Sequence, residues 1–247
     1  MAVTAAVIGS LLLGATASAS RVGIDTCLAY CGGPPTAIEY FADPGEANAV
    51  TVTVSQDRHV VQIDDPGANI SLTDTPPQSD YSTRPSHCLV VNPHQALCLM
   101  PDAVQSYNVG AITSGSIVDE LEAPQYGLFA SLADGNDRFR PGAGTEPLDV
   151  WVMGGDGNDD LLSGPGPGDH LSGDAGNDVI RTGASSQSTL SGGQGDDLIY
   201  ANNHVAHDSI ACDDYATTTP GVDSVWIDAD DDVWTPYGLC DNVTVVP

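Results

Sequence analysis

The sequence predicts an all-β protein in which a stack of short, repeated strands follows a β-strand-rich N-terminal region. Two observations carry this prediction. The first half alternates apolar and polar residues between turn clusters, whereas the second half repeats glycine turns that end in aspartate. No amphipathic helical period of useful length interrupts either half.

The N-terminal region shows the period-two pattern of half-buried strands. AVTVTV (residues 49–54) and HVVQID (59–64) alternate in this way, and clusters such as DPGEAN (43–48) and DPGA (65–68) separate them. The proline-rich stretch at residues 73–86 predicts an exposed loop. Residues 20–130 are therefore expected to form strands with tight connections.

The second half is organised by a repeat of two unequal units. One apolar residue follows each turn at spacings of 10, 9, 10 and 9, namely Leu161, Leu171, Ile180, Leu190 and Ile199. The aspartates Asp159, Asp178 and Asp197 recur every 19 residues. A coil of two strands and two turns explains this alternation, because units one coil apart then lie above one another.

Such a stack would place the three aspartates in a ladder at the spacing of neighbouring strands, about 4.8 Å. Like charges at that distance repel by about 1 kcal/mol in water, and by more where solvent is excluded. Calcium accepts six to eight oxygen ligands at about 2.3–2.6 Å, so an ion midway between two rungs meets both. Glycine turns can bend tightly and direct carbonyl oxygens inward as further ligands. The ladder therefore predicts bound Ca2+.

The turns resemble the hemolysin-type calcium-binding repeat, or RTX, whose nonapeptide is G-G-x-G-x-D-x-U-x with U apolar. GGDGNDDLL (154–162) and GGQGDDLIY (192–200) fit at every defined position, and GDAGNDVIR (173–181) lacks the second glycine. LADGNDRF (132–139) looks like an earlier unit. The chain as a whole is similar to secreted calcium-binding repeat proteins of actinobacteria.

This resemblance implies a parallel β-roll over residues 131–210 that binds calcium between successive turns of one edge. It implies carboxylate ligands at Asp159, Asp178 and Asp197, with Asp137 as a further candidate. The implied glycine-turn residues are Gly154, Gly155, Gly157, Gly173, Gly176, Gly192, Gly193 and Gly195.

The turns of the opposite edge depart from the repeat. SGPGPGD (163–169) and TGASSQS (182–188) are longer by one residue, and Ser188 stands where an aspartate is expected. The two edges should therefore be inequivalent, with little effect on calcium affinity when Asp169 is replaced.

Composition and the N-terminus indicate an exported, cation-binding chain. Thirty-four acidic residues stand against six basic ones, all arginine, for a formal net charge of −28. Phosphate binding requires clustered Arg and Lys, so nucleic acid and anionic membranes are poor partners. Residues 1–19 resemble a signal peptide cleaved after Ala19, although a buried strand or short helix is the alternative. No segment has the length of a membrane span, and we expect a monomeric extracellular protein.

Six cysteines in an exported chain favour disulfides. Fifteen pairings are possible, and grouping along the chain favours Cys27 with Cys31, Cys88 with Cys98, and Cys212 with Cys240. A zinc site is the weaker alternative, because no Cys-x2-Cys pair occurs. Residues 211–247 are expected to close the stack, with the acidic run at residues 228–232 either protecting the last strand or binding another ion.

Catalytic motifs are scarce. The chain has neither a His-Glu-x-x-His nor a Gly-x-Ser-x-Gly motif, and His204 with His207 are expected to be surface residues. The sequence thus predicts a secreted, non-enzymatic calcium-binding protein. A polysaccharide lyase or epimerase and a surface adhesin are the alternatives, the enzyme being disfavoured because arginines that could face uronate carboxylates are sparse.

Overall fold

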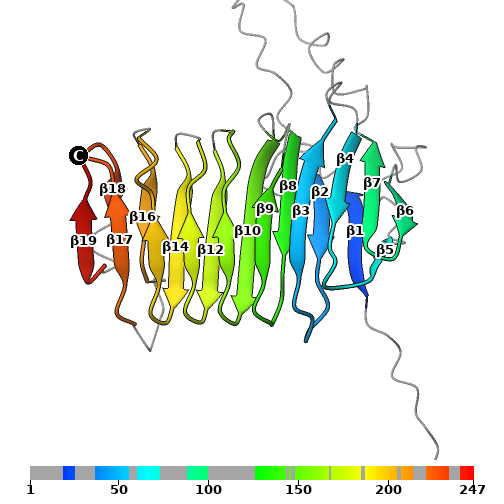
Figure 1. The fold of residues 1–247 in the computed structure, drawn as a ribbon, viewed down its shortest axis with the longest axis horizontal. Helices are drawn as coiled ribbons and strands as arrows, with labels where there is room; N and C mark the ends of the chain where they lie inside the picture. The colour runs from blue at the N-terminus through cyan, green and yellow to red at the C-terminus, as the bar shows by residue number, and fades with distance from the viewer. Residues whose placement is uncertain are drawn as a thin grey trace, which may run out of the picture.

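The computed structural model describes residues 19–25, 37–55, 60–72, 88–99, 126–142, 145, 148–166, 168–184, 187–204, 207–213, 221–233 and 240–247. These residues form nineteen strands and no helix, and within them no helix suited to crossing a membrane occurs. The strands stand side by side along the long axis of the molecule, from β6 at one end to β19 at the other (Figure 1).

The strands belong to two sheets. The 9-stranded sheet has the order β18-β16-β14-β12-β10-β8-β2-β1-β5. Its strands are β1 (Ser20–Asp25), β2 (Ala37–Phe41), β5 (Ile70–Leu72), β8 (Tyr126–Ser131), β10 (Leu148–Asp156), β12 (His170–Ala175), β14 (Thr189–Gln194), β16 (Ser209–Ala211) and β18 (Asp232–Val233).

The 10-stranded sheet has the order β19-β17-β15-β13-β11-β9-β3-β4-β7-β6. Its strands are β3 (Ala49–Val54), β4 (Val60–Asp64), β6 (Cys88–Asn92), β7 (Gln95–Leu99), β9 (Arg138–Pro141), β11 (Asp160–Leu162), β13 (Val179–Arg181), β15 (Leu198–Tyr200), β17 (Ser224–Ile227) and β19 (Asn242–Val245).

The predicted fold class, a parallel β-roll preceded by a β-strand-rich region, is wrong. Both sheets are mixed: β1 pairs antiparallel with β2, and β3–β4, β4–β7 and β6–β7 are antiparallel as well. The N-terminal strands also join the same sheets as the repeats, since β2 pairs with β8 and β3 with β9. Short connections such as the one between β6 and β7 reverse the chain, and a reversed chain pairs antiparallel with its neighbour.

The 19-residue spacing has a direct counterpart in strand register. Leu161 pairs with Ile180, and Ile180 with Ile199, in the 10-stranded sheet. Leu171 pairs with Leu190 in the other sheet. All five side chains are buried, because alternate residues of each strand point between the two sheets. One apolar core therefore runs from Val22 to Ile227.

Two disulfides hold the described strands. Cys88 and Cys98 join β6 to β7, and Cys212 joins Cys240 across 28 residues near the C-terminal end. These two pairings are as predicted, whereas Cys27 and Cys31 lie outside the described residues. Disulfides of this kind are compatible with an extracellular location.

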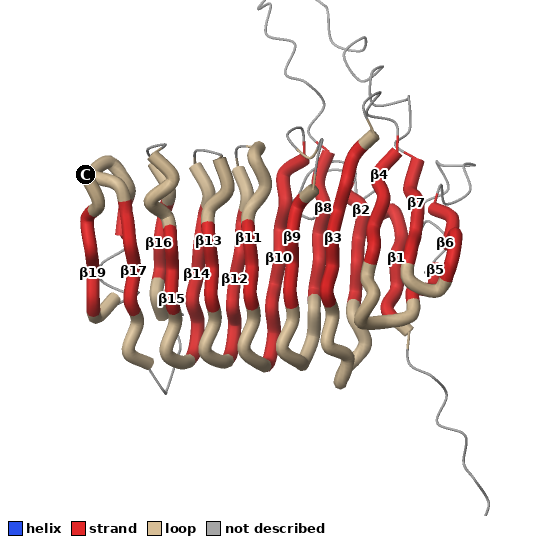
Figure 2. Tube along the Cα trace, in the orientation of Figure 1, coloured by secondary structure: helices blue, strands red, loops and turns tan. Residues whose placement is uncertain are grey.

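The turns fall on two edges, at opposite ends of the strands (Figure 2). We call the turns that join β10 to β11, β12 to β13 and β14 to β15 the first edge, and those that join β11 to β12, β13 to β14 and β15 to β16 the second edge. The first-edge turns share a left-handed backbone at the position of Gly155, where Asp174 has a φ of 70°. Ala133, at the same position of the equivalent turn between β8 and β9, has a φ of 69°. Asp174 stands at the second glycine that residues 173–181 lack, so an aspartate supplies the same conformation there.

Gly176 occupies the tightest position of its turn. Its φ is 141°, and an added Cβ would lie 1.6 Å from the carbonyl oxygen of Gly157 in the preceding turn. We expect Gly176→Ala to destabilise the fold by about 2 kcal/mol or more, measurable as a lowered melting midpoint. Gly45→Ala is the matched control, because Gly45 has a φ of 83° but nothing within 4 Å of the added Cβ. Equal losses for both variants would show that the close approach of the turns is unimportant.

Candidate metal centre

A chain of hydrogen bonds links the aspartates of the first edge. The main-chain N–H of Asp159 donates to Oδ1 of Asp178 at 2.7 Å, and that of Asp178 donates to Oδ1 of Asp197 at 2.8 Å. Each carboxylate thus accepts a hydrogen bond from the coil before it. The same bond joins Asp137 to Asp159 and Asn48 to Asp137.

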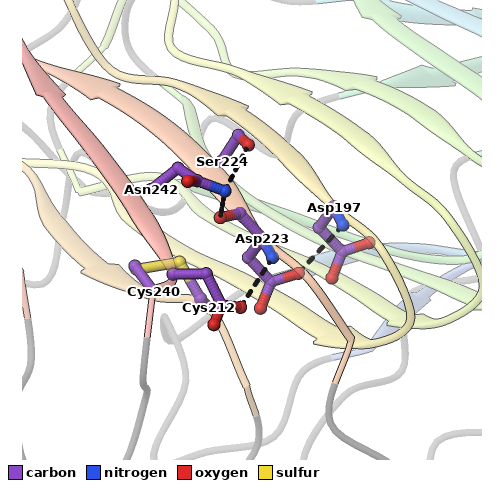
Figure 3. Close-up of a disulfide and its surroundings, with 7 residues drawn as sticks. Asp197, Cys212, Asp223, Ser224, Cys240 and Asn242 are labelled. Carbon is purple, nitrogen blue, oxygen red and sulfur yellow. Dashed lines mark hydrogen bonds between the residues drawn. A yellow bond between two sulfur atoms is a disulfide. The ribbon is translucent and has the colours of Figure 1, made fainter.

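This ladder continues beyond the glycine repeats. Asp197 N donates to Asp223 Oδ1 at 2.9 Å, and Asp223 N donates to Asp241 Oδ2 at 3.0 Å, beside the Cys212–Cys240 disulfide (Figure 3). Asp223 and Asp241 were not predicted from the sequence, because neither lies within a glycine nonapeptide. A usable signal was present: Asp223 stands two residues before the buried Val225, just as Asp159 stands two before Leu161. We call Asp137, Asp159, Asp178, Asp197, Asp223 and Asp241 the inner aspartate ladder.

The second carboxylate oxygen of most ladder residues has no partner. Oδ2 of Asp137, Asp159, Asp178, Asp197 and Asp223 is buried without a hydrogen bond. These side chains are at most 3% exposed. A buried carboxylate oxygen without a partner is costly and is rare in native proteins. The ladder therefore calls for a ligand of positive charge.

The first glycine of each turn makes room for that oxygen. A Cβ on Gly154 would lie 2.1 Å from Oδ2 of Asp159 and 2.8 Å from the carbonyl oxygen of Gly173 in the next coil. A Cβ on Gly173 would lie 2.1 Å from Oδ2 of Asp178 and 2.5 Å from the carbonyl oxygen of Gly192. At Gly192 the corresponding neighbours are Oδ2 of Asp197 and the carbonyl oxygen of Cys212, at 2.4 and 2.6 Å. Each turn thus brings one carboxylate and one carbonyl oxygen to the same space.

This donor set fits a hard cation. All the atoms concerned are oxygens, which calcium prefers, and neither thiolate nor imidazole takes part. Among the described residues, no three His, Cys, Asp or Glu side chains gather in a group that could hold a metal ion. An ion at these turns would therefore take main-chain carbonyls together with one or two carboxylates.

Burial also perturbs the acidity of the ladder. It raises the pKa of Asp137, Asp178 and Asp197 to about 7, while the main-chain hydrogen bond to each carboxylate opposes the shift. The pKa of Asp159 is raised by the same cause, and that of Asp223 is raised to about 6. Without a cation, Asp137, Asp178 and Asp197 therefore hold protons in the folded state near neutral pH.

The second edge carries a different row of polar residues. Val150 N donates to Asp169 Oδ1 at 2.9 Å, Ser188 N to Asp208 Oδ1 at 2.8 Å, and Asp208 N to Asp231 Oδ1 at 3.0 Å. Asp169 is fully buried, and burial raises its pKa to about 7. Asp169 and Ser188 were expected on this edge, whereas Asp208 and Asp231 were not predicted, because Ser188 interrupts the aspartate spacing. Asp231 belongs to it, so this member of the acidic run is a structural acceptor.

At Gly164, unlike the first-edge glycines, no carbonyl oxygen from another coil lies within 3.9 Å of the Cβ position. The atoms nearest to a Cβ on Gly164 would be Oδ2 of Asp169 at 3.1 Å, a methyl group of Val150 at 3.8 Å and the main-chain nitrogen of Gly166 at 3.9 Å. A methyl group and a nitrogen are not calcium ligands. The chemistry of the two edges therefore differs although both bury aspartate.

An outer row of amides lines the first-edge turns. Asn158 N donates to Asn136 Oδ1, and Asn177 N donates to Asn158 Oδ1, both at 2.8 Å. Asp196 N donates to Asn177 Oδ1 at 3.0 Å. Neutral amides stack here without repulsion, which explains why asparagine precedes the ladder aspartate in three of the turns. This structural role was not foreseen from the sequence.

The remaining candidates lie apart from the ladder. His204 is 74% exposed at its side chain, and its Nδ1 lies 3.6 Å from Asp228 Oδ1. His204 and His207 both have a left-handed backbone, with φ of 64° and 81°.

No protein-family model, curated protein or solved structure matches this chain.

Proposed function

We propose that the protein is a secreted, non-enzymatic calcium-binding protein that holds Ca2+ in the first-edge turns. The carboxylate ligands are Oδ2 of Asp159, Asp178 and Asp197, with Asp137 at the N-terminal end of the same row. Main-chain carbonyls of the glycine turns complete the ligand set. One observation carries this proposal. In each first-edge turn, Oδ2 of the ladder aspartate is buried without a hydrogen bond, and both this oxygen and a main-chain carbonyl oxygen of the next coil lie close to the first glycine of the turn.

Calcium would supply the positive charge that the ladder lacks. A ligand that binds only the folded state stabilises it by about 2.7 kcal/mol at a free concentration of 100 times its dissociation constant. Several sites in one row add their contributions. The folded chain would then be rigid in calcium. In chelator, repulsion among the ladder carboxylates would lower its stability.

An extracellular setting supplies this metal and agrees with the two disulfides. Extracellular calcium modules work with dissociation constants of about 10⁻⁴–10⁻³ M. We propose that residues 1–19 direct export and that calcium outside the cell rigidifies the mature chain. The match of residues 154–162 and 192–200 to the RTX nonapeptide supports the same function.

Isothermal titration of the full chain with calcium and with magnesium tests this proposal. We expect calcium to bind at two or more sites and magnesium to bind poorly, because Mg2+ requires a smaller octahedral shell and keeps its waters. Asp230→Asn is a matched control that removes an exposed aspartate; it should leave the titration unchanged. Absence of calcium binding at millimolar concentration, or equal binding of magnesium, would contradict the proposal.

A further inference from the structure

Five neighbouring strands of the 10-stranded sheet carry positive charge on their outer face, in a chain whose net charge is −28. Ten outward residues alternate with buried ones along β9, β11, β13, β15 and β17. They are Arg138, Arg140, Asp160, Leu162, Val179, Arg181, Leu198, Tyr200, Ser224 and Trp226. Three arginines against one aspartate give this face a formal charge of +2, with half of the chain's six arginines on it. The arginines that are sparse in the sequence are therefore gathered in the fold.

Part of this face forms a straight row across the strands. Leu162, Arg181, Tyr200 and Trp226 are successive register partners, so they are spaced by about 4.8 Å. The guanidinium of Arg181 lies 5.4 Å from the ring centroid of Tyr200. The rings of Tyr200 and Trp226 stack at 4.6 Å with an interplanar angle of 9°. We call Arg138, Arg140, Arg181, Tyr200 and Trp226 the arginine strip.

Asp160 fixes the arginines but neutralises one charge of the three. Arg140 and Arg181 each donate to its carboxylate, and Nε of Arg138 lies 3.8 Å from its Oδ2. The side chains of Arg138 and Arg181 remain 61% and 42% exposed. A guanidinium has five N–H donors in a planar fork that matches a carboxylate. Held by Asp160 and Tyr200, Arg181 would lose little side-chain freedom on binding an anion.

A structural role alone does not account for this arrangement. One arginine would neutralise Asp160, and Arg138 contributes a long contact while keeping most of its side chain in solvent. The excess charge is local, since the Debye length is about 8 Å at physiological ionic strength. A ligand on the strip therefore interacts mainly with the charged groups that it contacts directly. Its repulsion by the acidic residues at the strand ends is screened by salt.

We propose that the arginine strip binds an extended polysaccharide that carries carboxylate groups, such as a chain of uronic acids. A long ligand that crosses successive strands can use the whole row, whereas a compact anion would reach one or two arginines. Duplex nucleic acid carries a charge every 1.7 Å or so, which is too dense for a strip of net charge +2 on an acidic protein. The strip faces outward and the aspartate ladder lies between the sheets, so this proposal does not depend on calcium binding.

Binding of a fluorescently labelled galacturonate oligomer to the full chain, measured in chelator, tests the proposal. Chelator prevents calcium from bridging the oligomer to other carboxylates. We expect Arg181→Gln and Trp226→Ala to weaken binding by about tenfold or more. Arg21→Gln is the matched control, because Arg21 is 54% exposed on the other sheet, beside Asp43, and lies 6.0 Å from the Phe41 ring.

Any one of four results would overturn the proposal. The first two are absence of binding by the unaltered chain and an equal loss in Arg21→Gln. The other two are equal binding of an oligonucleotide and equal binding of the oligomer with its carboxylates reduced to alcohols. If Arg181→Gln lowers the melting midpoint, its loss of binding no longer separates ligand contact from stability. Binding by Arg138→Gln then tests the proposal, because Arg138 has the weaker contact with Asp160 and its replacement should disturb the fold less. Unchanged affinity in that variant would also count against the strip.

Discussion

Replacing Asp178 by asparagine is expected to reduce calcium affinity by about tenfold or more, which corresponds to about 1.4 kcal/mol. The amide keeps an oxygen that can accept the hydrogen bond from Asp159 N. It removes the negative charge and replaces the unpartnered Oδ2. Asp178 lies between two neighbours on the ladder, so its carboxylate can serve the ions on both sides. Titration calorimetry of the variant against the unaltered chain measures the loss.

The same substitution should have the opposite effect in chelator. An uncharged amide is less costly to bury than a carboxylate, so Asp178→Asn should melt at a higher temperature than the unaltered chain when calcium is absent. In saturating calcium it should melt at a lower one. A variant that is destabilised equally in both conditions would show a purely structural role for this side chain.

Asp169→Asn is the matched control for Asp178→Asn. Asp169 is equally buried and its Oδ2 also lacks a partner, but Gly164 brings no carbonyl oxygen beside it. We therefore expect its replacement to leave calcium affinity within about twofold. Equal losses from the two substitutions would exclude a calcium site confined to the first edge.

The stability of the chain is expected to fall as pH rises in chelator and to lose this dependence in saturating calcium. The pKa of Asp137, Asp178 and Asp197 is raised to about 7 in the fold, against about 3.9 in an unfolded chain. Between these values the folded state binds more protons than the unfolded state, so stability falls as pH rises. The contribution is fully present below about pH 4 and is lost by about pH 7.

Calcium removes this slope because it binds the carboxylate and competes with the proton. In saturating calcium neither the folded nor the unfolded aspartates hold protons above about pH 5, so stability should be nearly independent of pH from 5 to 7. Each titrating group changes the free energy of unfolding by up to about 1.4 kcal/mol per pH unit, and 1 kcal/mol corresponds to about 2–4 °C in a chain of this size. Melting curves across this range provide the measurement. Parallel slopes in the two conditions would contradict a ladder that exchanges protons for calcium.

The sequence predicts the ladder well where the repeat is regular. A spacing of 19 residues sets the register of Leu161 with Ile180, and that register brings the N–H of Asp159 to the carboxylate of Asp178. The glycines were also informative, because the close approach of Gly176 to Gly157 leaves no space for a side chain. Local spacing is therefore sufficient within residues 154–200.

The fold class could not be predicted because the strands outside the repeats have no common period. Asn48 lies next to Asp137 at the end of the ladder and donates a hydrogen bond to it, although 89 residues separate them. An asparagine does not fit the aspartate pattern, so the sequence did not reveal this neighbour. Asp223 follows Asp197 after 26 residues, a spacing that hides it from a search for multiples of 19. Parallel pairing of β2 with β8 and of β3 with β9 joins the antiparallel N-terminal strands to the repeat strands in the same two sheets, and no local pattern encodes this long-range pairing.

The arginine strip shows the same limit for surface sites. Arg140 and Arg181 are 41 residues apart in the sequence but meet at one carboxylate. Their proximity depends on β9, β11 and β13 being neighbours in register. Composition revealed the shortage of basic residues, and the fold was needed to show that three of them share one face.

Crystals grown in calcium, with the ions located by their anomalous scattering, test the central claim most directly. We expect ions between successive first-edge turns, within about 2.3–2.6 Å of Oδ2 of Asp159, Asp178 and Asp197 and of glycine carbonyl oxygens. Ions found there, and none beside Asp169, would establish the inner aspartate ladder as the calcium site. Ions confined to the second edge or to exposed carboxylates, with Oδ2 of the ladder still unpartnered, would contradict it.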